Sequence, residues 1–136
     1  MTKLRVIAGI LLAWNLLGCA MYLVQVTMDL DDLARTDPVT AEAFASMPSW
    51  AWAGYAMAVW FGAGAALALM LGRKLAVTLF TASLIGELFQ FGWTFLGFGL
   101  IARQGAGTLA FPLVIFAITL GSVYYARARE RDGTLR

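Results

Sequence analysis

The chain has 136 residues, of which 61% are hydrophobic and only 13% are charged, with a formal net charge of +2 at pH 7. A soluble domain carries about 25% charged residues, so this composition excludes water-soluble enzymes, nucleic-acid binders and disordered regulators. With no His and one Cys, the chain lacks the residues for bis-histidine haem, most zinc sites and an internal disulfide. We therefore expect an integral membrane protein whose surroundings are the lipid bilayer, with no metal, cofactor or nucleic-acid partner.

Four apolar stretches are each long enough to cross a hydrocarbon core about 30 Å thick. We place these spans at residues 6–28, 50–71, 75–98 and 108–126. The stretches are continuously apolar rather than alternating, so they predict helices. The expected fold class is all-α: a single four-transmembrane-helix bundle over residues 1–136.

The first span carries one polar face. Asn15, Tyr22 and Gln25 fall at i, i+7 and i+10, which places them on one side of a helix. The sequence Leu16-Leu17-Gly18-Cys19 also resembles the end of a lipoprotein signal, but the apolar run continues past it to spanning length. We therefore interpret the segment as a span and Cys19 as a small buried hydrophobe.

The loop at residues 29–49 is the only predicted connection large enough to hold structure. Asp37 followed by Pro38 is typical of an N-cap and the first residue of a helix. Apolar residues then recur every four positions, at Val39, Ala43 and Met47. We expect a short amphipathic helix here, lying on the outer membrane surface and ended by Pro48.

The second span is half small residues, with eight Ala and three Gly among residues 50–71. Small residues recur every four positions along one face and form a predicted helix-packing groove: Gly54, Ala58, Gly62 and Ala66. Such a stripe lets two helix backbones approach closely. The sequence leaves open whether the groove packs against another span of the same chain or against a second chain.

The third span follows the three-residue connection Gly72-Arg73-Lys74, so it must be an antiparallel neighbour of the second span. It carries a polar stripe at i, i+4, i+7 and i+11: Ser83, Glu87, Gln90 and Thr94. A rise of about 1.5 Å per residue places Asn15 level with the Ser83–Glu87 step. We expect the polar stripes of the first and third spans to face each other and to share a buried hydrogen-bonded strip.

Glu87 is the only acid within a predicted span. Burial in a low dielectric favours the neutral carboxyl, which can donate a hydrogen bond. One hypothesis is a structural carboxyl bonded to Asn15 or Gln90 that holds two helices together. The others are a proton- or cation-coupling carboxylate in a transport path, and a contact to a partner subunit or lipid.

The distribution of Lys and Arg predicts the topology, because basic loops stay in the cytoplasm. Eight of the ten basic residues fall on one side of the predicted membrane: Lys3, Arg5, Arg73, Lys74, Arg127, Arg129, Arg131 and Arg136. Arg35 and Arg103 fall on the other side, with the acids of the first loop. We therefore expect the N-terminus and the C-terminus to be cytoplasmic.

Motifs for catalysis or metal binding are missing. Asp29, Asp31 and Asp32 resemble the beginning of a calcium loop, but the Gly and the final Glu of such a loop are absent. The chain has no Gly-rich phosphate loop and no nucleophile–base pair. We therefore interpret these three acids as part of a solvated loop. Because catalytic motifs are missing, we do not expect an enzyme.

The stretch Trp14-Asn15-Leu16-Leu17-Gly18, followed by Tyr22 and Gln25, resembles the first helix of a broad group of small bacterial four-helix inner-membrane proteins. The residues Pro48, Trp50 and Ala53 and the Arg73-Lys74 connection are similar as well, so the resemblance covers about the first two-thirds of the chain. Some members of the group are labelled as sugar transporters. The chain differs from small multidrug transporters, whose acid lies in the first helix, and it lacks the glycine–arginine signature of fluoride channels. The resemblance implies a four-helix fold in the bacterial inner membrane.

These features predict a non-enzymatic membrane protein that acts by helix packing, as an accessory subunit of a homo-oligomer or of a larger membrane complex. Four helices enclose little volume, so a solute path within one copy is not expected. The alternative is a small oligomeric carrier or channel for a small solute, with Glu87 as the coupling acid. An intramembrane enzyme is a third hypothesis.

Overall fold

The computed structural model describes residues 2–136 and is helical along nearly all of them, with no strand in this range. The elements in chain order are α1 (Thr2–Val26), α2 (Leu30–Thr36), α3 (Pro38–Ser46), α4 (Ser49–Ala56), η1 (Met57–Phe61), α5 (Gly62–Met70), α6 (Leu75–Gly92), η2 (Trp93–Gly97), α7 (Leu100–Gln104), η3 (Ala106–Leu109) and α8 (Ala110–Arg131). Four stretches are long and apolar enough to cross a membrane: Thr2–Val26, Ser49–Met70, Leu75–Gly97 and Ala106–Arg131. The prediction of an all-helical chain with four candidate spans is confirmed.

Two helices extend beyond the predicted spans. α1 begins at Thr2 rather than at residue 6, and α8 ends at Arg131 rather than at residue 126. Hydropathy marks only the apolar part of a helix, whereas Ala, Arg and Glu have high helix propensity and continue the helix where it becomes polar. The basic residues at these two ends are therefore held on rigid helical turns.

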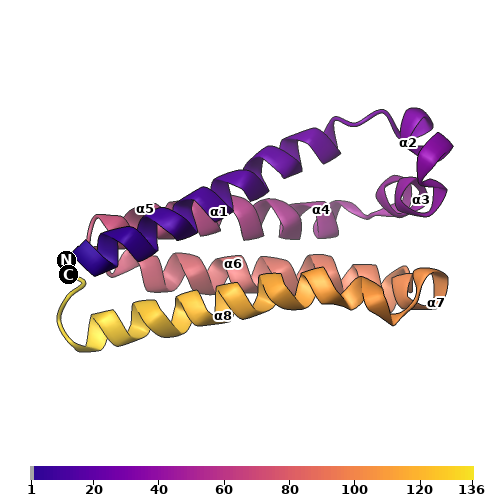
Figure 1. Ribbon diagram of the computed structural model, residues 1–136. Coiled ribbons are helices and arrows are strands. Elements are labelled where there is room, and N and C mark those ends of the chain that lie inside the picture. The colour runs from indigo at the N-terminus through magenta and orange to yellow at the C-terminus, as the bar shows by residue number, and fades with distance from the viewer. Residues whose placement is uncertain (1) are drawn as a thin grey trace.

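The four spans run alternately up and down, as Figure 1 shows. Spans that follow one another in the chain pack on one another: α1 on α5 and η1, α4 and α5 on α6, and α6 on α8. Both chain termini lie at one end, here called the terminus end, and α2, α3 and α7 lie at the other, here called the loop end. α1 diverges from α4 toward the loop end (Figure 1).

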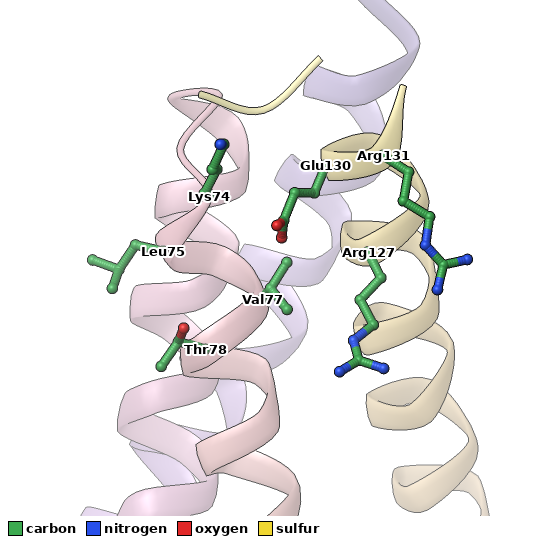
Figure 2. Close-up of a pocket in the computed structure, with 7 residues that line it drawn as sticks. All are labelled: Lys74, Leu75, Val77, Thr78, Arg127, Glu130 and Arg131. Carbon is green, nitrogen blue, oxygen red and sulfur yellow. The ribbon is translucent and has the colours of Figure 1, made fainter. Parts of the chain in front are cut away.

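At the terminus end, the last residues of the chain pair with the connection between α5 and α6. The Arg136 N–H donates to the Gly72 carbonyl at 2.8 Å, and the Lys74 N–H donates to the Arg136 carbonyl at 3.1 Å. Beside this connection, residues of α6 and α8 line a groove of about 510 Å³ (Figure 2). The tail after α8 is therefore part of the fold.

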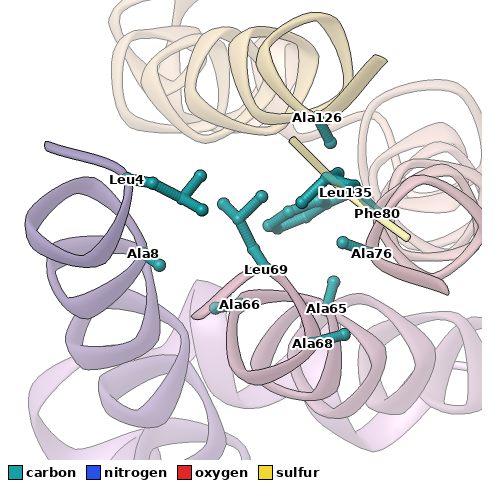
Figure 3. Close-up of a cluster of buried hydrophobic side chains, with 10 residues drawn as sticks. All are labelled: Leu4, Ala8, Ala65, Ala66, Ala68, Leu69, Ala76, Phe80, Ala126 and Leu135. Carbon is teal, nitrogen blue, oxygen red and sulfur yellow. The ribbon is translucent and has the colours of Figure 1, made fainter. Parts of the chain in front are cut away.

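The main hydrophobic core also lies at the terminus end and collects side chains from all four spans and the tail (Figure 3). Phe80 of α6, Leu69 of α5 and Leu135 of the tail are each no more than 1% exposed. The other members are Leu4, Ala8, Ala65, Ala66, Ala68, Ala76 and Ala126. Six of these seven are alanines, so the helices approach closely around the three large side chains.

α4 and α6 make their closest contact through two glycines. A Cβ built on Gly86 would lie 2.5 Å from the Gly54 carbonyl oxygen and 2.8 Å from the Ala58 nitrogen. A Cβ on Gly54 would lie 2.7 Å from the Gly86 carbonyl oxygen. Because the obstructing atoms belong to the backbone, neither helix can yield by a rotamer change, and only glycine allows this separation.

The loop end is organised by side-chain caps. Asp37 is the N-cap of α3 and accepts hydrogen bonds from the Thr40 N–H at 3.1 Å and the Thr40 hydroxyl at 2.6 Å. These bonds lower the pKa of Asp37 because they favour the carboxylate. Asp29 caps α2 in the same way, through the N–H groups of Asp31 and Asp32. Two of the acids of this loop, Asp29 and Asp37, thus serve as helix caps.

Two further contacts organise the loop end and the adjoining parts of α1 and α4. The Arg103 guanidinium of α7 donates to the Glu42 carboxylate of α3, and this bond lowers the pKa of Glu42. Met47, Ala51 and Tyr55 form a second buried cluster, against which Tyr22 and Trp52 pack. The Tyr22 and Tyr55 rings meet edge to face with centroids 5.1 Å apart. This aromatic contact joins α1 to α4 near the C-terminal end of α1.

We predict that Gly86→Ala destabilises the protein, because its methyl group would overlap backbone atoms of α4. The expected cost is about 1–3 kcal/mol of unfolding free energy, as for other overpacked cores. Gly92→Ala is the matched control on the same helix, since a Cβ there meets nothing within 4 Å. Alanine also has the higher helix propensity, so the control is expected to be neutral or stabilising. Reversible unfolding in mixed micelles measures both, and equal stability of the two variants would contradict the close-contact interpretation.

Candidate functional site

The second span contains a π-helical turn, η1, that receives side chains from both of its neighbours. The Ser83 hydroxyl of α6 donates to the Ala58 carbonyl at 2.5 Å, and the Cys19 thiol of α1 donates to the Val59 carbonyl at 3.3 Å. π turns are rare and often occur at functional sites. Residues 57–61 contain neither Pro nor Gly, so no residue pattern predicts this turn.

Gly62 immediately follows the π turn, and both Asn15 and Ser83 lie next to it. The Asn15 side-chain amide donates to the Leu11 carbonyl of its own helix at 2.8 Å. Its oxygen occupies the space that a Cβ on Gly62 would need, and the Ser83 hydroxyl would lie 3.2 Å from the same Cβ. Gly62 is thus the position where polar side chains of α1 and α6 reach the second span together.

Glu87 lies between α6 and α8, where it is hydrogen-bonded to Thr119. The two residues are only 4% and 6% exposed. The Thr119 hydroxyl also lies 3.1 Å from the Ile115 carbonyl, while the second Glu87 oxygen, Oε2, has no hydrogen-bond partner within residues 2–136. A hydroxyl has one proton to donate and can also accept. The pair can therefore hold either a carboxylate, as acceptor from Thr119, or a carboxyl, as donor to it.

The expected partners of Glu87, Asn15 or Gln90, are therefore wrong. α1 packs on α5 and η1, so the second span stands between α1 and α6. Within residues 2–136, no side-chain hydrogen bond joins the polar stripe of the first span to that of the third. Helical periodicity identifies the face on which a residue lies but not the helix that covers that face.

The remaining members of the two stripes lie apart from these contacts. Tyr22 packs in the aromatic cluster with Trp52 and Tyr55. The Thr94 hydroxyl donates to the backbone carbonyl of Gln90 at 3.0 Å. The side-chain amides of Gln25 and Gln90 are half-buried and make no hydrogen bond with the part of the chain described, residues 2–136. The structure thus divides the predicted strip into separate contacts.

The small residues of the second span contact α6, α1 and the core at the terminus end. Gly54 and Ala58 lie against Gly86 of α6, and Gly62 lies against Asn15 and Ser83. Ala66 is fully buried in the core at the terminus end. Each of the four residues therefore has a packing partner within this chain.

The buried hydroxyls of α8 are functional-site residues that the sequence pattern was not used to predict. Thr119 and Ser122 are buried, and the Ser122 hydroxyl donates to the Ile118 carbonyl of its own helix at 2.7 Å. The signal was present, because two hydroxyl residues three positions apart mark one face of an otherwise apolar helix. That face is the one α8 turns toward α6.

Comparisons of the chain with protein-family models, curated proteins and solved structures found no match. Among residues 2–136, no three Cys, Asp or Glu side chains gather closely enough to hold a metal ion. The chemistry available in the apolar parts of the spans therefore comes from the Glu87 carboxyl, several hydroxyls, the Cys19 thiol and the amides.

We predict that Glu87 and Thr119 are energetically coupled. Glu87→Gln retains a hydrogen-bond donor and should change stability little, whereas Glu87→Leu and Thr119→Val should each cost about 1 kcal/mol. A double-mutant cycle of the last two, measured by reversible unfolding in micelles, should give a coupling free energy of about 0.6 kcal/mol, typical of membrane hydrogen bonds.

Ser122→Ala provides the matched control, because the Ser122 hydroxyl bonds only within its own helix. Its effect should add to that of Glu87→Leu without coupling. Strict additivity of Glu87→Leu and Thr119→Val would show that the Glu87–Thr119 bond does not hold α6 and α8 together.

Proposed function

We propose that the protein is a non-enzymatic, multi-pass protein of the bacterial inner membrane that acts as an accessory subunit, packing against further copies of itself or a larger membrane complex. The single observation that supports this most directly is the unpaired side-chain amide of Gln90. Fifteen residues separate Gln90 from the beginning of α6, so it lies about 22 Å into a core about 30 Å thick. An amide at that depth needs a partner, and one from a second chain would satisfy it.

The packing of α1 also supports an accessory role. α1 contacts mainly the second span, and many of its large apolar side chains, such as Ile10, Leu17 and Val24, are at least half exposed. Its unpaired Gln25 amide lies near the end that diverges from α4. α1 therefore offers a long apolar face that lipid or another membrane helix can cover.

We propose that the terminus end faces the cytoplasm. Eight of the ten basic residues belong to this end, and the positive-inside rule assigns it to the cytoplasmic side. In this orientation α3 lies at the outer surface, where its buried Ala41 and Ala43 face the protein and its Glu42 pairs with Arg103. We propose that α3 is the short amphipathic helix of the first outer loop.

A small oligomeric carrier or channel for a small solute is the second candidate function. The observation that favours it is the Glu87 Oε2 atom, which is buried and has no hydrogen-bond partner within residues 2–136. A structural role for the carboxyl fits its other features better: it is bonded to Thr119, and no second acid lies in the apolar part of any span to exchange a proton with it.

Topology can be tested with reporters. We expect a reporter fused after Arg136 to be active in the cytoplasm, and a reporter inserted near Thr40 to be active only outside it. Cytoplasmic activity of the reporter near Thr40 would show that the first span does not cross the membrane. Activity of the C-terminal fusion outside the cytoplasm would overturn the proposed orientation.

Assembly can be tested through Gln90. In a mild detergent, the wild-type protein should migrate as a homo-oligomer or with a stoichiometric partner, and Gln90→Leu should shift it toward the single chain because the interchain amide bond is lost. Thr81→Val is the matched control on α6, since the exposed Thr81 hydroxyl already bonds to the Val77 carbonyl of its own helix.

Two results would count against the subunit role. One is a wild-type protein that remains a single chain at all concentrations and retains no partner. The other is proton-dependent solute uptake in vesicles that is lost in Glu87→Gln while folding is normal, which would favour the carrier.

A further inference from the structure

The groove between α6 and α8 at the terminus end is lined by an excess of positive charge. Lys74 comes from the beginning of α6, and Arg127 and Arg131 come from successive turns of α8; Glu130 is the one acid. Leu75, Val77 and Thr78 complete the lining. Three cations against one carboxylate leave a formal charge of +2 in a groove of about 510 Å³. Such a site favours an anion.

The cations of this groove differ from Arg35, Arg103 and Arg129 in having no acidic partner within residues 2–136. Arg35, Arg103 and Arg129 are each paired with an Asp or a Glu. Lys74, Arg127 and Arg131 form no ion pair within residues 2–136, and neither does Glu130, which stands among them. Figure 2 shows the Glu130 carboxylate reaching toward α6, with Lys74 and Arg127 on opposite sides of it in this view.

The groove lies at the depth of lipid headgroups. Lys74 immediately precedes the apolar stretch of the third span, and Arg127 immediately follows that of the fourth, so both cations stand at the same boundary of the hydrocarbon core. Leu75 and Tyr124 beside them are 57% and 77% exposed, as expected for side chains that face lipid and the interface. Arg127 and Arg131 also line an adjoining hollow of about 540 Å³ with Tyr124.

We propose that this groove binds the phosphate of an anionic membrane lipid headgroup. Arg127 and Arg131 supply planar guanidinium groups that can donate paired hydrogen bonds to phosphate oxygens, and Lys74 adds a mobile positive charge from the opposite wall. Leu75 and Val77 offer an apolar surface to the beginning of the acyl chains. Basic pockets between spans at the cytoplasmic surface are a recurrent way of holding such headgroups.

Glu130 decides which lipid class the groove prefers. A carboxylate among the cations weakens the attraction for a phosphate, so the proposal requires that Glu130→Gln strengthens binding of an anionic lipid. A zwitterionic phosphoethanolamine headgroup would instead use the carboxylate to hold its ammonium group, and the same substitution would then weaken binding. The net charge of +2 favours the anionic lipid.

The experiment titrates purified full-length protein in a neutral detergent with phosphatidylglycerol, and measures bound lipid by native mass spectrometry together with the thermal shift. Arg127→Gln/Arg131→Gln should weaken binding by about five-fold for each charge removed. Lys3→Gln/Arg5→Gln is the matched control, because it removes the same charge from the same end but outside the groove. Circular dichroism without lipid verifies that all variants fold; the substituted groove residues are exposed.

The expected result is saturable binding of phosphatidylglycerol that falls in Arg127→Gln/Arg131→Gln, is unchanged in Lys3→Gln/Arg5→Gln and rises in Glu130→Gln. Equal losses in the two double variants would overturn the proposal, because they would reflect diffuse charge attraction. Weaker binding in Glu130→Gln, or equal binding of phosphatidylethanolamine, would replace the anionic lipid with a zwitterionic one. Inorganic phosphate is the competing ligand to exclude: if it displaced phosphatidylglycerol at the concentrations at which the lipid binds, the site would take free phosphate and the proposal would be overturned.

Discussion

α4 and α6 meet backbone to backbone at Gly54 and Gly86, and the positions of the other spans follow from this contact. In lipid, apolar side chains gain little from leaving one hydrocarbon environment for another, so close packing and polar contacts hold helices together. The glycine contact brings the second and third spans close enough for Ser83 to reach the Ala58 carbonyl. α1 then packs on one side of this central pair and α8 on the other.

Each neighbouring pair of spans is joined by one polar contact inside the membrane. Cys19 joins α1 to the second span through the Val59 carbonyl, Ser83 joins the second span to the third, and Glu87 with Thr119 joins the third to the fourth. Two of these contacts end on carbonyls of the π turn. A single contact per interface fixes how two helices are rotated and shifted against one another, which apolar packing alone specifies weakly.

Sequence reasoning was most successful where a signal lies within one helix. Hydropathy located the four spans, and Asp37 with Pro38 marked the beginning of a helix that the structure also begins at Pro38. It was least successful where the signal depends on which helices are neighbours. Thr119 is far from Glu87 in the chain, and α1 and α6 are separated by the second span, so the predicted partners of Glu87 were wrong. Nothing in residues 57–61 distinguishes a π turn from an ordinary one.

Leu135 is the last residue of the hydrophobic core to be synthesised. It is 1% exposed and packs with Phe80 and Leu69, yet it is synthesised after all four spans. Until it arrives, these two side chains at the membrane boundary lack their cover, although every helix can already be inserted. Insertion and closure are therefore separate events, and the intermediate between them exposes an apolar surface at the terminus end.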